Sequence, residues 1–178
     1  MEKKLQIQKT MMIIYIISAV IAFTYSLCFM TAYKDLFGLM LKDNAKIAYF
    51  HDVFMQGFNQ TMFWFTLFGV ASIAFFFIFG TRTYVPDLLA VLFISISLLI
   101  VCGFCIYAFI ELPSLKQTYL SLDFSKMYLE GAVDYKVRTA TFTVGIVIFA
   151  IHFIVLLLTV GSQLLSFFGY KKLNKETA

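Results

Sequence analysis

Residues 88–110 read LLAVLFISISLLIVCGFCIYAFI, and no charge interrupts them between Asp87 and Glu111. An uncharged apolar stretch longer than about 18 residues is long enough to cross a bilayer as an α-helix. Three more stretches meet this criterion, and the four predicted spans lie at about 10–33, 60–81, 87–110 and 139–168. The sequence therefore predicts one domain, an all-α integral membrane protein with four transmembrane helices in two hairpins.

Composition agrees with this prediction. The chain is 61% hydrophobic and 13% charged, against roughly 45–50% and about 25% in soluble domains. A β-barrel is not expected, because barrel strands alternate apolar and polar residues and runs such as 73–79 (IAFFFIF) do not. The net charge of +4 comes without a basic stripe, which argues against nucleic acid as a partner. The chain is therefore expected to lie in a lipid bilayer.

The lysines and arginines near the span ends predict the orientation. If both termini share one side, each side of the membrane carries seven of these residues. On the side of the termini they lie in short segments, whereas on the other side they are spread through two long loops. We therefore expect both termini in the cytoplasm and the protein in the cell membrane, either plasma or inner.

The N-terminal stretch has a second interpretation as a signal peptide, because Lys3 and Lys4 precede an apolar run. Leu27 is bulky where a small residue would precede Cys28 in a lipoprotein cleavage site. The run is also long enough to span, so we expect the segment to be retained as the first span.

The two long loops, 34–59 and 111–138, each carry an apolar stripe with the three- and four-residue steps of one helical face. The first stripe consists of Leu36, Met40, Ile47, Phe50, Phe54 and Phe58, and the second of Leu115, Tyr119, Leu122, Leu129, Val133 and Val137. Each loop is therefore expected to form an amphipathic extracytoplasmic helix, continuous with the second and the fourth span respectively. A shift of 79 residues superimposes most of the two stripes, which fits either two duplicated hairpins or chance.

The stripes have three possible destinations. They can pack on each other as a cap, lie on the lipid surface or bind a partner protein. For the last case, the candidate contact residues are Phe50, Phe54, Leu129 and Val133.

Three cysteines are expected within the membrane, namely Cys28, Cys102 and Cys105. The C-x-x-C spacing of Cys102 and Cys105 is similar to that in quinone-coupled membrane thiol oxidoreductases such as the vitamin K epoxide reductase family. That family needs a second cysteine pair in an outer loop, and neither loop here contains a cysteine. The resemblance therefore ends at one tetrapeptide, and packing of a small, soft side chain is the preferred interpretation.

His152 is the ionisable residue nearest the middle of a predicted span. Such residues are functional candidates because their burial in lipid is costly. One hydrogen bond to a neighbouring helix would satisfy a neutral imidazole. A bis-histidine haem is not expected, because His51 falls in the first predicted loop. We expect no catalytic set, no metal and no cofactor.

Small residues on two spans offer surfaces for close helix approach. They include Gly69 on the second span and Gly145 and Gly161 on the fourth. We expect them to hold the bundle together rather than to bind a ligand.

These features favour a non-catalytic subunit or accessory protein of a membrane complex, which contacts its partner through the outer helices. The first alternative is a small homo-oligomeric transporter or lipid-handling protein with His152 on the substrate path. The second is a membrane thiol oxidoreductase that uses Cys102 and Cys105.

Overall fold

The computed structural model describes residues 2–27, 45–80, 88–124, 135–137 and 139–176. These residues form four long helices, α1 (Glu2–Leu27), α3 (Gln56–Gly80), α4 (Leu88–Leu120) and α5 (Ala140–Glu176). Three short elements complete the order: α2 (Ala45–Tyr49), the π-helix η1 (Phe50–Met55) and the 3₁₀-helix η2 (Tyr135–Val137). No strand occurs in these ranges, which confirms the all-α class.

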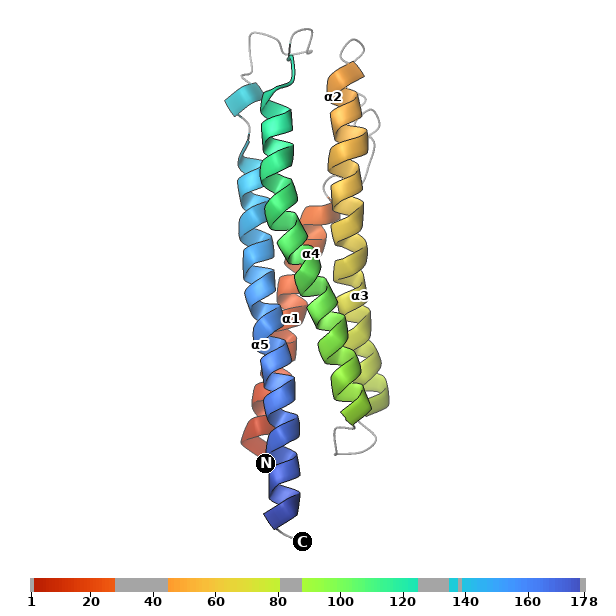
Figure 1. Ribbon diagram of the computed structural model, residues 1–178, viewed down its shortest axis with the longest axis vertical. Coiled ribbons are helices and arrows are strands. Elements are labelled where there is room, and N and C mark those ends of the chain that lie inside the picture. Colours follow the sequence, from red (N-terminus) through yellow and green to blue (C-terminus); the bar gives the residue numbers. More distant parts are fainter. Residues whose placement is uncertain (1, 28–44, 81–87, 125–134, 138, 177–178) are drawn as a thin grey trace.

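The long helices alternate in direction along the chain and form an elongated bundle (Figure 1). Helix α1 packs against α3 and α5, and α4 packs against the same two helices. Both chain ends lie at one end of the bundle (Figure 1). We call this the terminal end and the opposite one the distal end.

Each long helix buries one narrow stripe with alternating steps of three and four residues. On α4 the stripe is Val91, Ile94, Leu98, Val101, Cys105, Ala108, Leu112 and Leu115, and each of these side chains is at most 2% exposed. On α5 the same steps join Phe142, Gly145, Phe149, His152, Leu156, Thr159 and Gln163, all of them buried. Such steps are the mark of left-handed bundles whose helices cross at small angles.

Three helices are long and apolar enough to cross a membrane, and they contain Thr10–Leu27, Leu89–Leu120 and Ala140–Leu165. Large apolar residues such as Ile17, Ile96 and Ile154 are more than half exposed on their outer faces. An apolar surface of this extent requires lipid. The chain is therefore a membrane protein, and α3 completes the bundle that these three helices form.

Two tyrosines of α1 lie over glycines of neighbouring helices. A methyl group at Gly69 of α3 would collide with the Tyr15 hydroxyl, and one at Gly145 of α5 would collide with the Tyr25 hydroxyl. The Tyr25 hydroxyl also donates a hydrogen bond to the Thr141 carbonyl. Close approach at these two glycines is thus confirmed, whereas a methyl group at Gly161 would meet nothing within 4 Å.

The bundle continues beyond the predicted spans at the distal end. Helices α2, η1 and α3 follow one another without a break from Ala45 to Gly80, so the first loop is helical from Ala45 onward and His51 lies in a helix. Helix α4 does not end at Ile110 but runs through Pro113 to Leu120. The prediction that the second outer helix continues into the fourth span is therefore wrong for residues 111–120, because Leu112 and Leu115 extend the buried stripe of the third.

The positions of the two distal extensions along the chain bear on the proposed duplication. The first distal extension precedes α3, whereas the second follows α4. In the part of the chain that the structure describes, the two hairpins are therefore not alike. Residues 28–44 and 125–134, which carry the rest of both stripes, lie outside the described residues.

The π-helix changes which residues of the first stripe are buried. Ile47, Phe50, Met55 and Phe58 are at most 5% exposed, and the step from Phe50 to Met55 is five residues. A regular stripe would have buried Phe54 instead, but Phe54 is 43% exposed. The wider turn of a π-helix, whose hydrogen bonds join residues five apart, accounts for this shift.

Candidate functional site

Five polar side chains from three helices meet in the interior of the bundle. They are Tyr15 and Ser18 of α1, Cys102 and Cys105 of α4, and His152 of α5, and all five are buried. We call this group the central polar layer. It contains three of the four residues that the sequence singled out, whereas Cys28 lies outside the described residues.

His152 and Ser18 join α5 to α1 by a hydrogen bond. The Nδ1 atom of His152 lies 2.9 Å from Ser18 Oγ, and the Ser18 hydroxyl donates to the Tyr15 carbonyl at 2.8 Å. Because a hydroxyl has one proton, Ser18 accepts from the imidazole, which assigns the proton to Nδ1. A nucleophilic serine needs the opposite direction, with the imidazole as the acceptor, so this pair is built for structure rather than for acyl transfer.

Tyr15 connects the imidazole with the two thiols. Its ring centroid lies 5.6 Å from that of His152, with the planes tilted by 31°. Its hydroxyl lies over Gly69, and its side chain belongs to the same buried cluster as Cys102 and Cys105. Tyr15 is not among the candidate residues predicted from the sequence. Its place on the stripe Met12, Tyr15, Ala19, Ala22, Ser26, where small and polar residues recur, is the signal that would have found it.

The two cysteines of α4 are reduced and enclosed. Cys102 is 4% exposed and Cys105 is 0% exposed, and neither forms a disulfide. Within the described residues, no three side chains from histidine, cysteine, aspartate and glutamate come together as metal ligands would. The arrangement fits packing of soft side chains against Tyr15.

Apolar side chains flank the central polar layer toward both ends of the bundle. Toward the distal end, the Phe149 ring meets Phe58 at 6.1 Å and Tyr25 at 5.7 Å, edge to face in both cases. Toward the terminal end, the buried side chains include Ile73, Leu98 and Leu156. Buried polar side chains such as Ser72, Ser95 and Thr159 also lie on that side, so the layer is enclosed among mostly apolar residues.

The four candidate partner-contact residues have different environments. Phe50 is 5% exposed and packs on Tyr119 of α4 at 5.8 Å, and Tyr119 in turn packs on Phe142 of α5. Phe50 is thus part of an internal cap that joins the distal helices. Phe54 is on the surface, whereas Leu129 and Val133 lie outside the described residues.

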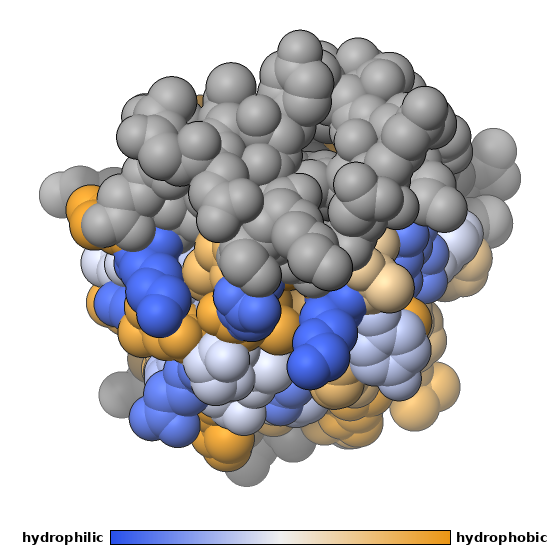
Figure 2. Space-filling model, turned by 90° about the horizontal axis from the view of Figure 1, so that it is seen from above, coloured by the Kyte–Doolittle hydropathy of each residue, from blue (hydrophilic) through white to orange (hydrophobic). Residues whose placement is uncertain are grey.

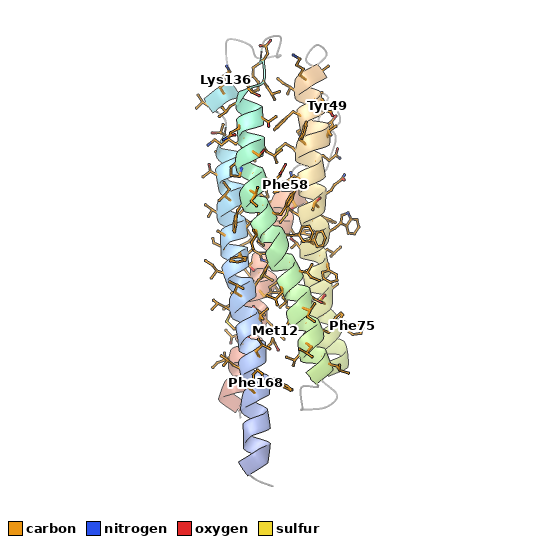
Figure 3. All side chains as sticks on the ribbon, in the orientation of Figure 1. Met12, Tyr49, Phe58, Phe75, Lys136 and Phe168 are labelled. Carbon is orange, nitrogen blue, oxygen red and sulfur yellow. The ribbon has the colours of Figure 1, made fainter. Side chains whose placement is uncertain are left out.

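Phe54 belongs to an exposed apolar group on the distal helix. Tyr49, Val53 and Phe54 are 59%, 48% and 43% exposed, and the Tyr49 and Phe54 rings meet edge to face at 5.7 Å. We call these three residues the distal patch. Tyr49 lies near the distal end of the bundle, and Phe58 lies nearer its middle on the same continuous helix (Figure 3).

The distal patch lies among polar residues. His51 and Asp52, whose side chains lie 2.9 Å apart, come between Tyr49 and Val53, and Gln56 and Gln60 follow Phe54. Viewed from the distal end, the surface is a mixture of hydrophilic and hydrophobic residues (Figure 2). Val53 precedes Met62, where the long apolar run of α3 begins, by about 13 Å of helix. The patch therefore lies outside the apolar part of the bundle.

Comparison of the chain with protein-family profiles, with curated proteins and with solved structures finds no match.

Proposed function

We propose that this protein is a non-catalytic subunit or accessory protein of a membrane complex, and that it contacts a protein partner through the distal patch. It crosses the cell membrane four times, with both termini in the cytoplasm. The distal end of the bundle then projects from the opposite face of the membrane.

Two features support four crossings. Helix α3 has 25 residues without a charged side chain, which is enough to span the hydrocarbon core. It also packs along α1 and α4 within the same bundle. Lysines concentrate on the terminal ends of α1 and α5, at Lys3, Lys4, Lys9, Lys171, Lys172 and Lys175, and such a concentration favours the cytoplasmic side.

The distal patch favours a protein partner over the two other destinations of an apolar stripe. Ile47 and Phe50 are already buried within the distal part of the bundle. The three residues of the distal patch remain exposed. A helix that lies on a lipid surface runs in the plane of the membrane. Helices α2 and η1 instead continue along the axis of α3 (Figure 1), away from the bilayer.

The π-helix is the observation that carries this proposal. It turns Val53 and Phe54 toward solvent where a regular stripe would bury Phe54. π-Helices are rare and occur frequently at functional sites. Exposed aromatic and aliphatic residues on a rigid helix are the kind of group that anchors protein interfaces.

The two alternative functions receive less support. Transport by way of His152 needs a path to the imidazole, whereas the His152 side chain is 0% exposed. Thiol exchange needs an accessible thiolate, whereas Cys102 and Cys105 are at most 4% exposed.

Site-specific crosslinking in native membranes tests the proposed contact. A photoreactive phenylalanine analogue at Phe54 or Tyr49 is expected to give a crosslink to a different protein. The matched control carries the analogue at Gln117, an exposed residue on the distal part of α4, and should give none. Crosslinks from Phe54 only to lipid or to a second copy of the chain would contradict the proposal.

Deletion of Val53 tests the role of the π-helix. It shortens the step from Phe50 to Met55 to four residues, which an ordinary α-helix accommodates on one face. We expect the thermal midpoint in detergent to stay the same or to rise, while the crosslink from Phe54 is lost. A large fall in the midpoint would show that the π-helix is needed for packing rather than for the exposure of Phe54.

A further inference from the structure

Two polar atoms in the central polar layer have no hydrogen-bond partner among the described residues. They are the Tyr15 hydroxyl and His152 Nε2, and both side chains are 0% exposed. An unpaired polar group in a hydrocarbon surrounding costs several kcal/mol. Two such groups in neighbouring side chains point to a further molecule that forms hydrogen bonds with both.

The two atoms are chemically complementary. Because His152 Nδ1 donates its proton to Ser18, Nε2 carries a lone pair and accepts. The Tyr15 hydroxyl has a proton to donate. The two rings lie 5.6 Å apart, yet no direct hydrogen bond joins these atoms.

A single water molecule has the hydrogen-bonding capacity that this arrangement lacks. Its oxygen accepts the phenol proton, and one of its own protons goes to Nε2. Internal waters typically make about three hydrogen bonds, and these two side chains supply two of them.

We propose that the central polar layer holds one internal water molecule between the Tyr15 hydroxyl and His152 Nε2. The water completes a chain of hydrogen bonds from the Tyr15 hydroxyl through His152 and Ser18 to the Tyr15 carbonyl. This chain ties α5 to α1 at one level of the bundle. A slip of either helix would break it, so the water helps to fix their register.

Water fits this place better than a metal ion or an organic ligand. The layer contains no carboxylate, and no metal-binding group of three side chains occurs among residues 2–27, 45–80, 88–124 and 139–176. Where the phenol lies over Gly69, even a methyl group would collide with the hydroxyl, which leaves no room there for an organic ligand.

Water-selective NMR on protein labelled with ¹⁵N-histidine, reconstituted in lipid nanodiscs, tests the proposal. The chain has two histidines, and a His51→Gln background leaves His152 as the only labelled imidazole. We expect His152 to be the Nδ1–H tautomer, with magnetisation transfer from a bound water to the ring at Nε2.

Two tyrosine variants make the test specific. Tyr15→Phe removes only the hydroxyl and should reduce the transfer to the noise level. Tyr25→Phe is the matched control, because its hydroxyl already donates to the Thr141 carbonyl, and it should leave the transfer intact. Absence of transfer in the parent protein, or equal transfer in Tyr15→Phe, would overturn the proposal. The parent measurement decides the matter even if a variant folds poorly.

Discussion

Phe149→Ala is expected to lower the free energy of unfolding by about 3 kcal/mol or more, the usual cost of removing a buried aromatic ring. Phe149 is 0% exposed and meets the rings of Phe58 and Tyr25 from two other helices. In lipid, helix association depends on close packing, so the loss of this shared ring weakens several contacts at once. Reversible unfolding in mixed micelles measures the effect.

A neighbouring residue on α5 provides the control for this substitution. Ile151 is 54% exposed and faces away from the bundle, so Ile151→Ala removes an apolar side chain of similar chemistry without opening the core. Its free energy of unfolding should stay close to that of the parent protein. Equal losses in the two variants would contradict the observed core.

Gly145→Ala is the second substitution for which we expect a large effect. The added methyl group would meet the Tyr25 hydroxyl and ring, as well as Leu112. Tyr25 has little freedom to move, because its hydroxyl is bonded to Thr141 and its ring packs on Phe149. Overpacking of this kind typically costs about 1–3 kcal/mol, which the same unfolding measurement would detect.

Gly103→Ala is the matched control for Gly145→Ala. Gly103 is also helical, but a methyl group there meets nothing within 4 Å. Alanine favours a helix over glycine by roughly 1 kcal/mol, so this variant should be as stable as the parent or slightly more so. If Gly145→Ala behaves in the same way, α1 and α5 are not as close as the structure has them.

The central polar layer also shows how the bundle can contain a buried histidine that has no catalytic role. A neutral imidazole that donates to Ser18 and accepts from a water has all its hydrogen-bonding capacity used. Its cost in the membrane is then offset by contacts that specify one arrangement of α1 and α5. Buried polar groups have this role in coiled coils, where a single polar residue sets the register.

Length and absence of charge are strong local signals for a membrane helix. The three candidate membrane segments Thr10–Leu27, Leu89–Leu120 and Ala140–Leu165 all overlap predicted spans. Helix α4 does not end at Glu111, where the predicted third span stops, but runs through Pro113 to Leu120. Leu112 and Leu115 continue the buried stripe there, and their packing outweighs the proline.

The two distal segments show a second kind of limit. The regular steps of the first stripe predicted that Phe50 and Phe54 share one face. In the π-helix their rings still lie 6.1 Å apart, but Phe50 is 5% exposed and Phe54 is 43% exposed. Nothing in the local sequence signals a π-helix. It forms because packing buries the apolar residues before it and those after it, and the two sets do not fall on one face of a regular α-helix.

The sequence by itself therefore determined the helical class of this protein, its place in a membrane and three apolar segments of membrane-spanning length, and it singled out His152. Only the tertiary structure decided which face of each span is buried. The physical reason is that a span is apolar all round, so hydropathy does not distinguish the lipid-facing side from the packed side. The meeting of Tyr15, Ser18 and His152, and the outward turn of the distal patch, follow from contacts between helices that are far apart in the chain.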